Sequence, residues 1–276
     1  MWICPVCNRP LERQDSSFRC TAGHSFDCAR SGYVHLLPVQ RKHAKIPGDN
    51  KLMVAARRRF LEKGFYAPLA QQVCQTTADR LEVDGTEMPV LLDAGCGEGY
   101  YTGKICEELD QRGLQAEILG VDISKIALDK AAKRVKQAQF AVASVYHLPV
   151  ASESVDFLSD LFAPCAWEEY RRVIRPGGAM LLVIPGEDHL WELKQAVYPA
   201  PYKNEVKGFD LEGFRLCSQH EVRQTIHLKN REDIADLFCM TPYYYKTSRE
   251  SQARLFALTE LATRTTFELL LYEKMR

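Results

Sequence analysis

The residues with the clearest potential for chemistry lie between positions 90 and 99, which read Val-Leu-Leu-Asp-Ala-Gly-Cys-Gly-Glu-Gly. A short apolar run ends in Asp93, and Gly95, Gly97 and Gly99 follow at alternate positions. The pattern predicts a buried strand, a tight turn whose backbone approaches a ligand closely, and then a helix. A nicotinamide site typically has G-x-G-x-x-G, and an acid at the strand end suits a positively charged ligand better than phosphates. S-adenosylmethionine (AdoMet) is such a ligand.

A glycine-rich turn can also be a plain turn, and the downstream sequence strengthens the ligand-site interpretation. Ile118-Leu-Gly-Val-Asp122 predicts a second strand, and an acid at the end of such a strand bonds the ribose hydroxyls of an adenosine in doubly wound sheets. Further strand-like runs begin at Phe140, Val155 and Val173. This ordered series resembles the class I AdoMet-dependent methyltransferases over roughly residues 85 to 276. The resemblance implies an α/β, Rossmann-like doubly wound sheet, in which residues 265–272 fit the antiparallel last strand.

A second set of reactive residues lies near the N-terminus. Cys4-Pro-Val-Cys7 and Cys20-Thr-Ala-Gly-His24 form two turns of the kind that hold a tetrahedral zinc ion. A redox C-x-x-C motif and unrelated buried thiols are the alternatives, and Cys28 is a rival to His24 as the fourth ligand. The unit is too small to hold a core, so we expect Zn²⁺ to supply most of its folding free energy and the larger domain to keep its own unfolding transition without it.

Composition limits the class of protein. The 276 residues are 46% hydrophobic, enough for one large and one small domain, and no apolar run is long enough to cross a membrane. Ten cysteines without a visible secretion signal predict reduced thiols and a cytoplasmic protein. Residues 1–60 carry 11 Lys/Arg and 4 Asp/Glu in a chain of zero net charge, which indicates a polyanionic partner for the N-terminal part. A solvated basic linker is the alternative.

The sequence suggests three segments: a zinc-binding, RNA-recognition module (1–37), a basic linker with the start of the first helix (38–59), and the methyltransferase domain (60–276). Residues 40–47 are polar and basic, and Asp49 is expected to cap a helix that runs to about Lys63. On that helix Leu52, Ala56 and Phe60 form an apolar stripe. Lys51 and Arg58 share the opposite side, flanked by Arg57 and Arg59, and could contact phosphates or simply face solvent.

Taken together, the zinc-type module, Gly32-Tyr-Val-His-Leu-Leu-Pro38, Ala56-Arg57-Arg58 and Gly95-Cys-Gly-Glu-Gly-Tyr-Tyr-Thr102 resemble one family along essentially the whole chain. This family is the zinc-containing bacterial 23S rRNA guanine-N1 methyltransferases. The resemblance implies a homodimer that acts on a 23S rRNA stem-loop, with the zinc module helping to hold the RNA. It also implies AdoMet contacts at Tyr66, Gly97, Glu98 and His189. Without the resemblance, Tyr66 would be interpreted as a core tyrosine and Gly97 as a turn glycine. Glu98 would be an acid in the first turn of a helix, and His189 a surface histidine.

Methylation of guanine N1 requires an unpaired base and the loss of the N1 proton, which a positioned general base can assist. Asp160, at the end of a predicted strand, and His189 are the two candidates. The run Asp160-Leu-Phe-Ala-Pro-Cys165 departs from the [N/D]-P-P-[Y/F] motif of exocyclic-amine methyltransferases and disfavours such a target. Cys165 follows a proline, as the nucleophile of cytosine-C5 enzymes does, but an ordinary buried thiol explains it equally simply.

Two rival functions remain on this evidence. A methyltransferase for a small molecule that carries a zinc ribbon would turn over without RNA and tolerate neutralisation of Arg57, Arg58 and Arg59. A non-catalytic RNA-binding protein with a vestigial pocket would bind AdoMet without methyl transfer. The intact acid-glycine loop and Asp122 disfavour the second rival.

Overall fold

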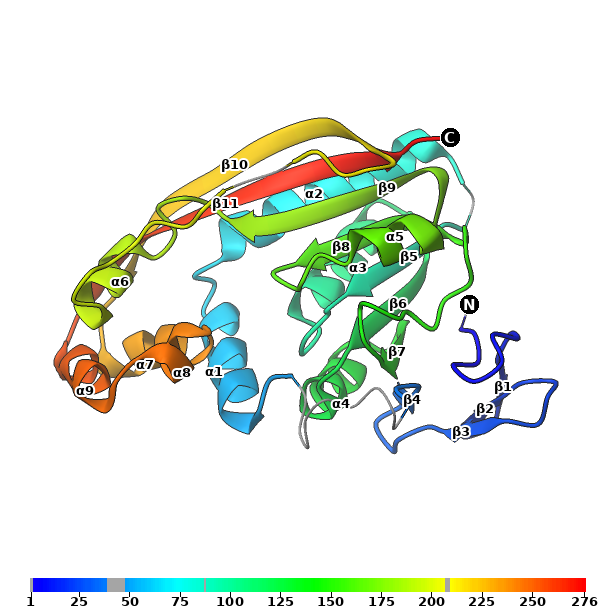
Figure 1. Ribbon diagram of the computed structural model, residues 1–276, viewed down its shortest axis with the longest axis horizontal. Helices are drawn as coiled ribbons and strands as arrows, with labels where there is room; N and C mark the ends of the chain where they lie inside the picture. The colour runs from blue at the N-terminus through cyan, green and yellow to red at the C-terminus, as the bar shows by residue number, and fades with distance from the viewer. Residues whose placement is uncertain (1, 39–47, 87, 207–208) are drawn as a thin grey trace.

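The computed structural model describes residues 2–38, 48–86, 88–206 and 209–276, and its frame is one mixed β-sheet (Figure 1). Within these residues the sheet has eight strands, whose spatial order is β10-β11-β9-β8-β5-β6-β7-β4. In that order they are Phe214–Leu228, Leu261–Lys274, Ile174–Pro185, Val155–Leu161, Val90–Ala94, Glu117–Asp122, Ala138–Val142 and Val34–His35. The strands from β9 to β4 are parallel, and β10 and β11 are antiparallel. The predicted doubly wound sheet with an antiparallel last strand is confirmed.

The two faces of the sheet are covered differently. On one face pack α2 (Ala67–Asp84), α3 (Tyr100–Gln111) and α4 (Lys125–Arg134), whose buried side chains share a core with Leu91 of β5. On the other face α5 (Trp167–Val173) and the N-terminal module share a second core with Leu92. Adjacent residues of one strand therefore serve opposite cores, as the alternation of side chains along a strand requires.

The N-terminal module is a three-stranded antiparallel sheet of β1 (Glu12–Gln14), β2 (Ser17–Arg19) and β3 (Ser25–Asp27), and it is joined to the main sheet. Trp2 is 2% exposed and pairs with Val150, while β4 pairs with β7. The module therefore also has apolar packing, which it shares with the catalytic domain.

The remaining helices lie under one end of the long antiparallel pair β10–β11 (Figure 1). They are α1 (Lys51–Glu62), α6 (Trp191–Val197), α7 (Arg231–Cys239), α8 (Tyr243–Lys246) and α9 (Arg249–Ala257). The edge strand β10 was not predicted from the sequence. No helix in the described ranges has the length and apolar character needed to span a bilayer.

Helix α1 begins one residue later than predicted. The side chain of Asn50, not Asp49, accepts the N–H of Met53 at 3.1 Å. Asp49 instead forms an ion pair with Arg57. The predicted apolar stripe is partly wrong, because Ala56 and Phe60 are buried but Leu52 is exposed. The predicted polar and basic stretch at residues 40–47 lies outside the described residues.

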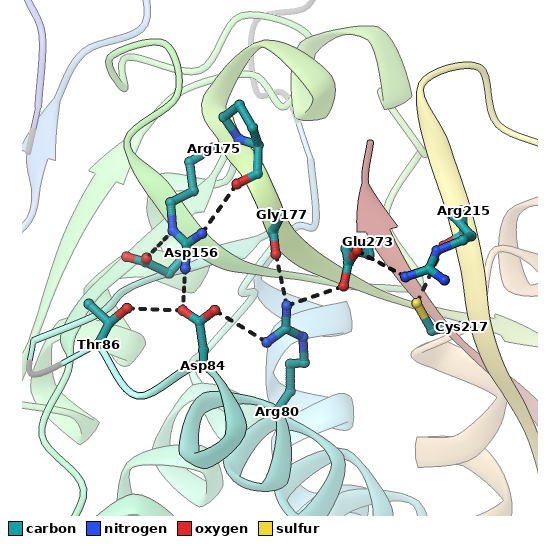
Figure 2. A network of polar contacts seen from close by, with 10 residues as sticks. Arg80, Asp84, Thr86, Asp156, Arg175, Gly177, Arg215, Cys217 and Glu273 are labelled. Carbon is teal, nitrogen blue, oxygen red and sulfur yellow. Dashed lines mark hydrogen bonds and ion pairs between the residues drawn. The ribbon is translucent and has the colours of Figure 1, made fainter. Parts of the chain in front are cut away.

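A network of ion pairs ties the elements together at the amino ends of the parallel strands, the edge opposite the glycine-rich loop (Figure 2). Arg175 at the start of β9 binds Asp156 of β8 at 2.6 Å and also Asp84 at the end of α2. Asp156 in turn accepts the N–H of Val90, the first residue of β5, at 2.7 Å. The network fixes the starts of the strands whose other ends build the site.

Candidate active site and metal centre

A cavity of about 540 Å³ opens at the carboxyl ends of β5, β6 and β8. This is the point where the strand order reverses, because β5 has β6 on one side and β8 on the other. Doubly wound sheets bind their ligands at such a switch point, and the volume is that of a small-molecule site. The wall includes predicted residues from all parts of the chain: Tyr66, Asp93, Gly95, Gly97, Glu98, Asp122 and His189.

The three glycines of the loop after β5 differ in what surrounds them. All three glycines have positive φ, +87° at Gly95, +56° at Gly97 and +80° at Gly99. A Cβ at Gly95 would lie 2.5 Å from the Cβ of Ala163, and one at Gly99 would lie 3.0 Å from the backbone of Ala131 in α4. At Gly97 the nearest atom would be 3.9 Å away, so that position opens on the cavity. Gly97 is therefore the glycine that lets a ligand approach the backbone, and Gly99 does not line the cavity but permits helix packing.

The two predicted acids are held in different ways. Both oxygens of the buried Asp93 carboxylate accept hydroxyl hydrogen bonds, from Thr102 and, at 3.2 Å, from Ser159. Burial raises its pKa to about 6. Asp122 accepts the backbone N–H of Gly97 at 2.9 Å and that of Ser124 at 2.7 Å. Each of its oxygens keeps a second lone pair for a ligand hydroxyl. Asp93 thus joins β5 to α3 and β8, while Asp122 holds the backbone of the glycine-rich loop at Gly97.

Glu98 lies 2.9 Å from Arg134 of α4 and is 2% exposed. Burial raises its pKa to about 7 against the lowering effect of Arg134. Arg134 also binds Glu62 of α1 at 2.7 Å. The carboxylate of Glu98 therefore links the glycine loop to two helices at the edge of the cavity.

Tyr66 and His189 form one aromatic wall with Phe267. The Tyr66 ring meets Phe267 edge-on at 4.9 Å between centroids, and the His189 ring is 4.6 Å from Phe267. His189 Nδ1 accepts the backbone N–H of Thr266 at 3.3 Å. Burial lowers the pKa of His189 to about 3, so the imidazole is neutral at pH 7, and its proton must be on Nε2. In this state His189 is a hydrogen-bond donor at Nε2.

The predicted candidate base Asp160 has no exposed surface and is not part of the cavity wall. Its carboxylate accepts the hydroxyl of Tyr170 at 2.8 Å and the N–H of Ala163 at 3.0 Å. Burial raises its pKa to about 7. The side chain of Asp160 thus holds the loop that follows β8, and Cys165, with a pKa that burial raises to about 11, is a poor nucleophile there.

Two arginines of α1 have partners that the sequence did not reveal, and one of them, Arg57, lines the cavity. Arg57 binds Asp49 and the carbonyl of Met240, and it lies over Gly97. Arg59 forms a fork with Asp236 of α7. Two of the three arginines of this face therefore have acidic partners within the protein, which a helical pattern cannot reveal without knowledge of the segments packed beside it.

The four predicted metal ligands converge. Cys4, Cys7, Cys20 and His24 place their ligand atoms within 4.8 Å of one another. Cys4 Sγ lies 3.6 Å from His24 Nδ1, and Cys7 Sγ lies 3.6 Å from Cys20 Sγ. Ligand atoms around a tetrahedral zinc are about 3.5–3.8 Å apart, so the donor set fits the ion. Cys28, the rival fourth ligand, is not part of this cluster.

The cavity also fits AdoMet. It has an open backbone position at Gly97, a carboxylate at Asp122 for ribose hydroxyls, and aromatic and apolar walls for the rest of the ligand. The wall falls into two halves, one at the ends of β5, β6 and β7 and one at the ends of β8 and β9, beside Phe267 of β11. Two reactants can therefore lie side by side across the switch point.

Comparison with protein families finds two matches. Residues 2–45 match the zinc-ribbon family described as "RlmA, N-terminal", and residues 91–178 match a family described as "Methyltransferase domain". These ranges contain the metal cluster and the glycine loop, respectively.

Similar curated proteins extend over nearly the whole chain. The chain is 34% identical to the 23S rRNA (guanine(748)-N(1))-methyltransferase of Streptomyces fradiae, covering 92% of this chain and 89% of that protein. The chain is also 35% identical to a protein of Micromonospora griseorubida, covering 95% of this chain and 93% of that protein, and 33% identical to one of Bacillus subtilis (strain 168), covering 91% and 89%. Both relatives bear the name "Putative 23S rRNA (guanine-N(1)-)-methyltransferase".

Proposed function

Since the chain belongs to the 23S rRNA (guanine-N1)-methyltransferase family, we propose that it transfers a methyl group from AdoMet to N1 of a guanine in a 23S rRNA stem-loop. One observation carries the proposal: similarity to such an enzyme spans both the zinc site and the cavity, and the two belong to one folded unit. A zinc ribbon joined to an unrelated methyltransferase would match in two pieces.

AdoMet supplies an electrophilic methyl group, and the residues of the chain bind and orient the reactants. We propose that Asp122 binds the ribose hydroxyls of AdoMet. We propose that the Nε2–H of His189 donates a hydrogen bond to a polar oxygen of AdoMet. Tyr66 closes the cavity between Phe60 and Phe267. Asp160 acts as a positioning residue through the loop after β8, in place of the general-base role considered from the sequence. Positioning of two reactants supplies most of the acceleration in such a displacement.

A basic groove between α1 and α4 supports an RNA substrate. It has a volume of about 650 Å³ and is lined by five cations, Lys51, Arg58, Arg59, Lys125 and Lys130, against two acids. Among the described residues, Lys125 and Lys130 form no ion pair, so their charges are available to phosphates. Tyr33 of the N-terminal module also lines the groove, so the module and the catalytic domain both contribute to this surface.

The test is methyl transfer by the zinc-loaded full-length protein to 23S rRNA that lacks the modification. We expect 1-methylguanosine at one position in the digested RNA. A Lys125→Glu/Lys130→Glu double variant should bind RNA at least tenfold more weakly, because phosphate contacts dominate affinity. Lys133→Glu, on the same helix but paired with Asp129, is the matched control.

Each rival gives a different result. Turnover of a small molecule without RNA, unaffected by the double variant, would indicate a small-molecule methyltransferase. Binding of AdoMet and RNA without methylation would indicate a non-catalytic RNA-binding protein. The homodimer implied by the resemblance and a cytoplasmic location are further parts of the proposal, and a reducing compartment suits ten cysteines that form no disulfide with one another in the described structure.

A further inference from the structure

Phe162, the first residue after β8, has a backbone conformation that its side chain does not favour. Its φ is +65°, in the left-handed region that β-carbon sterics penalise outside glycine. The conformation is held from both sides: the N–H of Phe162 binds the carbonyl of Val183 at 3.1 Å, and the N–H of Ala163 binds the side chain of Asp160. Strained residues that the surroundings hold in place cluster at functional sites.

The side chain of Phe162 is also placed unusually for a phenylalanine. It is 42% exposed, although the preceding residue, Leu161, is buried. The ring lines the cavity, with its centroid 5.5 Å from that of Phe267 and the planes inclined at 56°. An apolar ring is thus held at the edge of the cavity with part of its surface uncovered.

Its position separates Phe162 from the ribose-binding side. Asp122 lies at the end of β6 and Gly97 in the loop after β5, whereas Phe162 follows β8 and contacts Phe267 of β11 in the other half of the cavity. That half is where the second reactant can lie.

We infer that Phe162 is the stacking platform for the acceptor guanine, an inference that rests on the proposed function. A guanine that leaves its helix loses stacking, which an aromatic face replaces while the Watson–Crick edge with N1 stays free to react. The left-handed turn presents the ring to the cavity, and Asp160 and Val183 hold it there.

The test compares substitutions that separate the ring from the backbone. Phe162→Leu keeps an apolar side chain of similar size at the same φ but removes the aromatic face, and Phe162→Tyr keeps that face. Phe162→Gly removes the ring and relieves the backbone. We expect kcat/KM for RNA to fall at least tenfold in the Leu and Gly variants and to stay within threefold of wild type in the Tyr variant, since stacking on one base carries an effect of this size.

Two further measurements make the result decisive. The Kd for AdoMet should change less than twofold in all three variants, and the Tm of Phe162→Gly should not fall, because a structural role would lower it. The inference is overturned if the Leu variant methylates RNA as wild type does, or if the loss appears in AdoMet affinity instead. A wild-type protein that forms no 1-methylguanosine would instead refute the proposed function.

Discussion

The surroundings of His189 fix both its charge and its tautomer. The backbone N–H of Thr266 occupies Nδ1, and burial lowers the pKa to about 3, so Nε2 carries a proton throughout the neutral range. A nitrogen that carries a proton cannot accept the N1 proton of guanine. The geometry therefore favours a donor over the general base suggested by the sequence.

We expect His189→Ala to weaken AdoMet binding about tenfold, the effect of one hydrogen bond to a polar ligand group. His189→Gln should retain more affinity than His189→Asn, because a glutamine amide can replace the Nε2–H and an asparagine amide replaces the Nδ1 position. Calorimetry measures the affinities. An inflection in kcat near pH 6.5 that vanishes in His189→Gln would contradict the donor role.

At the scale of elements, the ion-pair network at the amino ends of the strands is separate from the site (Figure 2). Arg175 joins Asp84 and Asp156, which are 17% and 11% exposed at the side chain. We expect Arg175→Met to lower the free energy of unfolding by about 1–3 kcal/mol, because two partly buried carboxylates lose the guanidinium that they share. Urea unfolding measures the change, and AdoMet affinity should stay constant. Arg215→Met, which breaks an exposed pair with Glu273, should cost under about 1 kcal/mol.

The difference in stability between wild type and Arg175→Met should depend on pH. Burial raises the pKa of Asp84, but hydrogen bonds from Arg175 and Thr86 and the charge of Arg80 outweigh it, so the pKa falls below 3.8. A carboxylate with a lowered pKa stabilises the fold above its unfolded-state pKa, and this contribution is lost as pH falls through the folded-state pKa. The difference in stability between wild type and Arg175→Met should therefore narrow below about pH 4. A constant difference from pH 7 to pH 3 would contradict this linkage.

The elements around the cavity could be predicted because their sequences carry local signals. β5, β6 and β8 are short runs rich in apolar residues, each with an acid at or next to its carboxyl end, and the glycines mark the turn that follows β5. β10 was harder to predict, because it is an edge strand of the described sheet and most of its side chains before Val222 are exposed, so only its second half alternates in burial. The inward position of Arg57 and the exposed ring of Phe162 depend on segments far away in the chain, Met240 and Val183, which local patterns do not reveal.

At the scale of the whole molecule, the N-terminal module takes the place of a helix layer on one face of the sheet. Trp2, Leu11, Phe18 and Val34 share a core with Leu92 and its neighbours. The sequence predicted the four zinc ligands but not this packing. From the sequence alone, the apolar residues of the module could pack only against one another, because nothing local indicates that they contact the main sheet. This shared core changes the expected effect of metal loss.

Because the two parts share one core, removal of zinc should reach the catalytic domain. We expect a chelator, or Cys20→Ser, to lower the Tm of the entire protein in a single transition, since the metal stabilises only the folded state and Trp2 and β4 pack against the main sheet. Calorimetry and zinc content measured on the same samples test this, with Cys217→Ser, an exposed thiol outside the metal cluster, as the control. A zinc-free protein whose main transition stays at the wild-type temperature would show that the module folds independently. A Cys20→Ser variant that retains a full equivalent of zinc would instead refute the ligand set.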